Sequence, residues 1–183
     1  EGLPEMIYLP DTSQICHFTD SVSRTTFIGE AIELFQLAQQ YAFNHGVIDQ
    51  IEPAYLAVTK NQGGFAKQGF YLRMHDGNVL DKSKTHYIDL TRGTLLSPLE
   101  ELSSVTQIYP HELMHAIYRM LSASGSEDPP SYNVNMHYFS VITDFNTAFN
   151  EGFAEHMEAV SLMYEPDIFI KEGKKREIDS KFE

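Results

Sequence analysis

The run Pro110–Ala116 carries the side chains best suited to chemistry, because it reads Pro-His-Glu-Leu-Met-His-Ala and so contains an H-E-x-x-H motif. On a helix, His111 and His115 are four residues apart and project from one face, close enough for two imidazole nitrogens to bind one tetrahedral cation. Glu112 lies beside that cation and is free to act as a base. The motif therefore predicts a zinc centre that activates water for hydrolysis.

A catalytic zinc ion needs a third protein ligand, and the segment Asn150–Glu155 supplies two candidates. Its sequence, Asn-Glu-Gly-Phe-Ala-Glu, places Glu151 and Glu155 one helical turn apart on one face. If this face meets the two histidines, one carboxylate can complete a His₂Glu site, and the other can accept the second ring N–H of a ligand histidine. Gly152 has no side chain, which would let the two helices approach closely.

Alternatives stay open at these positions. The third ligand could instead be Glu155, or else His137 or Asp144 in the segment between the two motifs. His156 and Glu158 follow on the same helix, and we expect both at the surface. The alternative to metal binding by the H-E-x-x-H motif is a pair of solvent-facing histidines on a helix.

The two motifs resemble those of the gluzincins, the thermolysin-like zinc metallopeptidases, which carry H-E-x-x-H and, on a downstream helix, N-E-x-x-x-[DE]. The resemblance implies His111, His115 and Glu151 as zinc ligands, Glu112 as general base and Glu155 as a partner of a ligand histidine. It also implies one catalytic Zn²⁺ ion. The expected fold is α+β and zincin-like: an N-terminal helix and a small mixed sheet pack on the active-site helix, and a second helix follows with the third ligand.

Two features depart from the family pattern. The spacing from His115 to Glu151 is 36 positions, 151 minus 115, which is longer than in thermolysin itself. The chain also ends soon after the second motif, where these enzymes often continue into a helical second lobe. We therefore expect either a fragment of a longer protein or a minimal form of the family.

The function predicted from these motifs is a zinc-dependent peptidase that acts on a peptide or protein substrate. Glu112 would take a proton from the attacking water and pass it to the leaving amine. Candidates for stabilising the oxyanion are Tyr132, His137 and Tyr138, which lie between the two ligand helices, and a donor outside this sequence is an equal alternative. By resemblance, an extended substrate would pair with an edge strand, for which Gly63–Met74 is the candidate. Two other functions stay open: a non-catalytic zincin-like binding or assembly module, and a zinc hydrolase of non-peptide substrates.

The elements before the motif are expected to be a helix and a small sheet. Apolar residues recur at helical spacing from Phe27 to Ala42, and Asn44-His45-Gly46 is a typical helix stop. Four short runs rich in aromatic or β-branched residues predict strands, at 6–9, 54–59, 69–74 and 85–90. The glycine-bearing connection at 61–68 suggests a hairpin or a bulged edge strand between the second and third runs, and Asp76-Gly77-Asn78 predicts a turn between the third and fourth.

The two ligand helices have their own signals. Ser97-Pro98-Leu99-Glu100 is typical of a capping box, from which the first helix is expected to run to about Leu121. Pro110 predicts a kink in this helix, or else a fresh start there. The expected buried stripe of the first helix consists of Leu102, Val105, Tyr109, Leu113, Ala116, Ile117 and Met120. The second helix is expected to begin near Asp144. Its expected apolar stripe consists of Phe149, Gly152, Phe153, Val160 and Met163.

Length and charge limit the function classes. A chain of 183 residues with 42% hydrophobic residues can bury one substantial core, which predicts a single domain made of 1–96, 97–165 and a charged tail or linker at 166–183. The formal charge of -13 argues against a nucleic acid or an anionic membrane as partner, because both need clustered cations. No apolar run is long enough for a membrane span. The sequence starts at Glu1, so a signal peptide could already be removed, and a secreted or cell-envelope location is slightly favoured over a cytoplasmic one.

Overall fold

A computed structural model describes residues 2–8, 26–60, 64–97, 105–122, 145–163, 166 and 168–180. These residues form a four-stranded mixed sheet and five helices, so the predicted α+β class is confirmed at this coarse level. The strands are β1 (Glu5–Ile7), β2 (Tyr55–Thr59), β3 (Gly64–Arg73) and β4 (Val79–Thr91). The helices are α2 (Thr26–Asn44), α3 (Arg92–Leu96), α4 (Val105–Leu121), α5 (Phe145–Leu162) and α6 (Ile168–Ser180). None of these helices has the length and apolar character that crossing a membrane requires.

The sheet has the strand order β1-β3-β4-β2. β3 and β4 form an antiparallel hairpin whose turn is closed by Gly77 at φ +87°, as the Asp76-Gly77-Asn78 signal predicted. β1 and β2 add to the two sides of this hairpin as parallel strands. The prediction of a hairpin between the runs 54–59 and 69–74 is therefore wrong, because β4 lies between β2 and β3 in the sheet. β4 takes the central place because residues on both of its faces are buried at its carboxyl end, as at Tyr87 and Ile88.

β3 is an edge strand over only part of its length. β1 covers it from Tyr71 to Arg73, whereas Gly64–Gln68 has β4 on one side and no other described strand on the opposite side. The register shifts where these two parts meet: between the pairs Gln68–His86 and Phe70–Lys82, the single residue Gly69 of β3, at φ +87°, lies opposite residues 83–85 of β4. Of the segment Gly63–Met74, predicted to pair with a substrate, only the first half of β3 therefore has an edge that no described strand covers.

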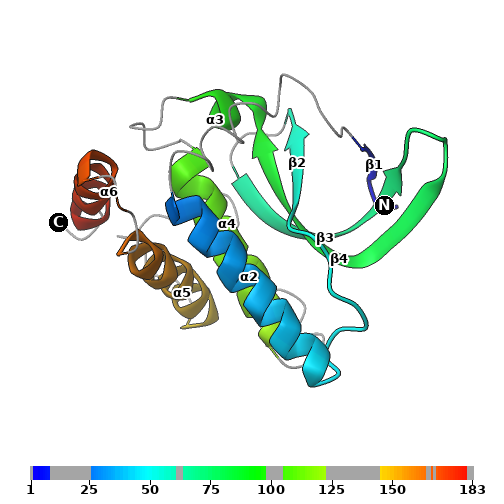
Figure 1. Cartoon of the computed structure of the whole chain (residues 1–183), viewed down its shortest axis with the longest axis horizontal. Helices are drawn as coiled ribbons and strands as arrows, with labels where there is room; N and C mark the ends of the chain where they lie inside the picture. Colours follow the sequence, from blue (N-terminus) through cyan, green and yellow to red (C-terminus); the bar gives the residue numbers. More distant parts are fainter. Residues whose placement is uncertain are drawn as a thin grey trace.

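α4 lies at the centre of the helical part, where it contacts α2, α5 and the hairpin (Figure 1). The predicted periodicity of α2 is confirmed, because Ile28, Ala31, Phe35, Ala38 and Ala42 are buried against α4 and the sheet. α2 ends at Asn44, at the start of the predicted stop Asn44-His45-Gly46, and Gly46 with φ of +69° turns the chain away. This packing leaves α4 little freedom and fixes the direction in which its polar side chains point.

The described part of α4 runs without a break from Val105 through Pro110, so the alternative of a fresh start at the proline is wrong. Its stripe Val105, Tyr109, Leu113, Ala116, Ile117 and Met120 is buried as predicted. Ser97 ends α3, where its hydroxyl donates to the Gly93 carbonyl at 2.9 Å. The rest of the proposed capping box lies outside the described residues, and the kink stays a prediction.

α5 begins at Phe145, one residue from the predicted start, but it buries a different face from the predicted one. Phe149 is 51% exposed and Met163 is 69% exposed, whereas Ala154 and Glu158 are buried. The buried face carries carboxylates that lie near the histidines of α4, together with Ala154, while Phe153 of the predicted stripe is partly buried against the core. The segment 166–183, predicted as a charged tail or linker, contains the helix α6, whose Phe169 is 85% exposed.

Candidate metal centre

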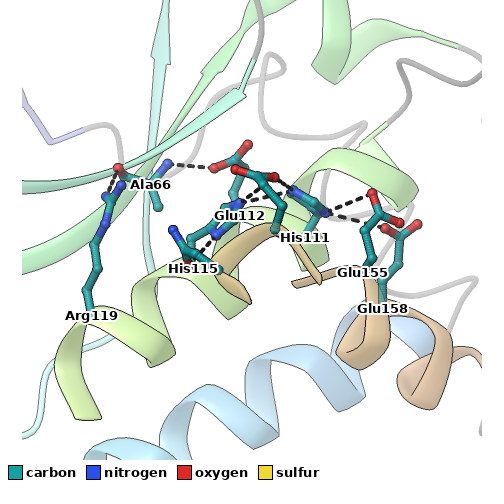
Figure 2. A network of polar contacts seen from close by, with 9 residues as sticks. Ala66, His111, Glu112, His115, Arg119, Glu155 and Glu158 are labelled. Atoms are coloured by element: carbon teal, nitrogen blue, oxygen red, sulfur yellow. Dashed lines mark hydrogen bonds and ion pairs between the residues drawn. The ribbon is translucent and has the colours of Figure 1, made fainter. Parts of the chain in front are cut away.

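His111 and His115 project from α4 toward α5, one helical turn apart (Figure 2). Their Nε2 atoms lie 3.0 Å from each other, and their ring planes are nearly perpendicular. His115 is only 6% exposed, and the side chain of His111 is 16% exposed. The alternative of a solvent-facing pair is therefore wrong.

Glu151 of α5 completes a triangle with these two nitrogens. Its Oε2 atom lies 3.4 Å from Nε2 of His111 and 3.5 Å from Nε2 of His115. Zinc bonds of about 2.0–2.1 Å at tetrahedral angles place neighbouring ligand atoms about 3.3–3.4 Å apart. The three sides of 3.0, 3.4 and 3.5 Å are close to this requirement. These three atoms could therefore hold a cation of zinc size.

The opposite ring nitrogens of the histidines face acceptors. Nδ1 of His115 lies 3.0 Å from Oδ1 of Asn150, an acceptor, so Nδ1 donates and Nε2 keeps its lone pair for a cation. Nδ1 of His111 faces two carboxylates, Glu155 at 3.6 Å and Glu158 at 3.7 Å. Both rings therefore direct Nε2 into the triangle.

Glu112 points to the other side of α4, toward β3. Its Oε2 atom accepts the backbone N–H of Ala66 at 2.7 Å, and Arg119 donates to the carbonyl of the same Ala66 (Figure 2). β3 comes this close because of Gly64, where an added Cβ would lie 2.1 Å from Cγ2 of Ile108. Glu112 is thus outside the triangle, and its carboxylate lies between α4 and β3.

The charges at the centre favour a bound cation or proton. Burial lowers the pKa of His111, but the carboxylates of Glu151 and Glu158, with help from Glu112 and Glu155, outweigh this and raise that pKa to about 10. Burial raises the pKa of Glu151, but hydrogen bonds to the two histidines hold it well below its usual range. A divalent cation would take the place of the proton on His111, as metal binding to histidine generally releases protons.

The structure brings together all five residues predicted for the site: His111, Glu112, His115, Glu151 and Glu155. Glu155 faces a ring nitrogen of His111, as expected, at ion-pair distance. The other candidates, Tyr132, His137, Tyr138 and Asp144, lie outside the described residues.

Sequence reasoning missed two neighbours of the histidines, Asn150 and Glu158. Glu158 was expected at the surface, but it is 1% exposed, whereas His156 is exposed as predicted. The missed signal was the spacing of 151, 155 and 158, which continues one helix face for two turns. The role expected for Gly152 is also wrong: it is exposed, and a Cβ there would meet nothing within 4 Å.

Comparisons of this chain with protein-family models, curated proteins and solved structures find no match. The geometry of these residues alone therefore supports a metal site here. The ligand triangle, the oriented rings and the adjacent carboxylate arise on two helices that are far apart in the sequence.

Proposed function

We propose that this protein is a zinc-dependent peptidase of gluzincin type, with His111, His115 and Glu151 as zinc ligands. The observation that carries the proposal is the triangle of Nε2, Nε2 and Oε2 atoms with sides of 3.0, 3.4 and 3.5 Å. Glu112 adds to it, because binding a metal does not require a carboxylate at that position. The fold in this proposal is zincin-like, and the packing of α4 between the hairpin and α5 supports it.

The chain's own residues divide the chemistry between them. A zinc ion held at the triangle would lower the pKa of a water molecule toward neutrality and polarise a substrate carbonyl. Glu112 takes a proton from the attacking water and transfers it to the leaving amine as the peptide C–N bond breaks. The backbone N–H of Ala66, 2.7 Å from Glu112, fixes that carboxylate in place until water and substrate enter.

The first half of β3 is the proposed substrate-binding edge. Gly64–Gln68 pairs with β4 on one side, and its other side meets α4 at Ala66. An extended peptide that pairs with this stretch would replace the bonds that Ala66 now makes to Glu112 and Arg119, and would bring a scissile bond beside Glu112. This placement explains why the general base is anchored to the strand.

The test compares the wild-type protein with Glu112→Gln. The variant should retain one zinc ion per chain, measured by metal analysis, and should lose cleavage of a mixed peptide library by at least about 100-fold. Chelation should abolish cleavage by the wild type, and added zinc should restore it. Glu33→Gln, the same change at an exposed position of α2, is the matched control and should cleave normally.

A second variant tests the third ligand. Glu151→Ala should bind zinc more weakly, and unchanged zinc content would assign the third ligand to another residue. Persistent cleavage by Glu112→Gln would refute the general-base role. Full zinc occupancy without peptide cleavage by the wild type would refute the peptidase.

A further inference from the structure

Glu158 is the most deeply buried carboxylate near the centre. It lies on α5 one turn beyond Glu155, and both carboxylates face the ring of His111 (Figure 2). Its Oε2 atom is 3.7 Å from Nδ1 of His111, and its side chain is 1% exposed, compared with 11% for Glu155. A carboxylate removed from water costs several kcal/mol unless it has charged or hydrogen-bonding partners. The burial of Glu158 is therefore best explained by the ring of His111, which it faces.

The two histidines differ in the groups that face their outer nitrogens. His115 has a neutral acceptor, the amide of Asn150. His111 has two carboxylates, Glu155 and Glu158. One carboxylate is enough to select the Nδ1–H form of a ligand histidine, and a negative charge at that hydrogen makes the opposite nitrogen a stronger donor to a metal. The second, buried carboxylate adds to this charge from a position that solvent screens weakly.

We propose that Glu158 is a positioning residue of the metal centre: with Glu155 it holds the His111 ring so that Nε2 points at the cation, and it strengthens that nitrogen as a ligand. This inference rests on the proposed zinc centre. It assigns a role to a residue outside both sequence motifs, and it makes His111 the more strongly polarised of the two histidine ligands.

The test measures zinc affinity and zinc-free stability on the same variants. Glu158→Gln should weaken zinc binding by roughly 10- to 100-fold in competition with a chromophoric chelator. The melting temperature without zinc should fall, because the substitution removes one of the two carboxylates that face the buried His111 ring. A residue that only supports the fold would lower the melting temperature in the same way but would leave the zinc affinity of the folded fraction unaltered. Proton NMR of the zinc-loaded protein adds a local readout, since the Nδ1–H resonance of His111 should shift in this variant.

Glu33→Gln is again the matched control and should change neither quantity. If the wild type binds zinc and the zinc affinity of Glu158→Gln is within about twofold of the wild-type affinity, the inference is overturned. The proposed function would stay intact in that case. An unshifted Nδ1–H resonance of His111 in zinc-loaded Glu158→Gln would also overturn the inference, and this readout does not depend on the stability of the zinc-free protein. Absence of zinc binding by the wild type would instead overturn the proposed function, and this inference with it.

Discussion

Gly64→Ala tests whether β3 lies so close to α4 that an added Cβ at position 64 lowers the free energy of unfolding. The new Cβ would lie 2.1 Å from Cγ2 of Ile108, 3.0 Å from Cδ2 of Leu90 and 3.4 Å from Cγ of Glu112. The first pair must separate by about 1.3 Å, from 2.1 to 3.4 Å, before it reaches ordinary contact. Leu90 is fully buried, which limits the room for this movement.

Two effects of opposite sign decide the result. Overpacking of this kind costs about 1–3 kcal/mol. The lower chain entropy of alanine in the unfolded state stabilises the protein by about 0.4–1 kcal/mol. The steric term is larger, so we expect a net loss of about 1–2 kcal/mol in the free energy of unfolding, measured by denaturation with urea. Gly29→Ala is the matched control: this helical glycine has nothing within 4 Å of its Cβ position, and the variant should gain roughly 0.5–1 kcal/mol.

A double variant identifies the contact responsible. Ile108→Ala removes the atom in the clash, so its combination with Gly64→Ala should cost at least about 1 kcal/mol less than the sum of the single losses. A Gly64→Ala protein as stable as the wild type would refute the close approach of strand and helix. Additive losses in the double variant would show that Ile108 is not the obstacle.

Two further predictions concern stability and pH. His86 lies on β4, and burial, with a smaller contribution from Arg119, lowers its pKa from 6.5 to about 4. The stabilisation that comes from keeping this ring neutral is complete above pH 6.5 and is lost as the pH falls toward 4. The wild type should therefore lose about 3 kcal/mol more than His86→Gln between pH 7 and 4 in urea denaturation, and equal losses would contradict the assignment. Gly152→Ala should raise the free energy of unfolding by roughly 0.5–1 kcal/mol with unchanged zinc affinity, because a Cβ there meets no neighbour; a weaker zinc site would restore the idea of a glycine-dependent helix contact.

Local patterns were enough to predict much of the fold. The apolar spacing in α2 and α4 identified their buried faces, because both helices pack mainly through apolar side chains. The turn at Gly77 followed from residue types that adopt positive φ. The candidate ligands also followed from spacing, because residues four apart on a helix share a face whatever lies around them.

Features that depend on partners distant in the sequence were not predictable. Nothing in the run 54–59 shows that it pairs with β4 in preference to β3, because strand pairing is decided by the whole sheet. The buried face of α5 was misassigned, because glutamate is usually a surface residue and the burial of Glu158 beside His111 depends on a helix distant in the sequence. Gly152 was misread for a similar reason: a small residue indicates that close packing is allowed, without showing where it occurs.

The strand order also dictates a sequence of events during synthesis. Among the described strands, only β3 and β4 are neighbours both along the chain and in the sheet. β1 and β2 leave the ribosome earlier, and each must wait for a strand of the later hairpin before its backbone can pair. α4 and then α5 follow, so a nascent chain that stops before residue 145 has both histidines of the centre but not Glu151. The candidate zinc site is therefore completed late in synthesis. Zinc bound by all three candidate ligands can stabilise only chains in which the strands, α4 and the first part of α5 have already been synthesised.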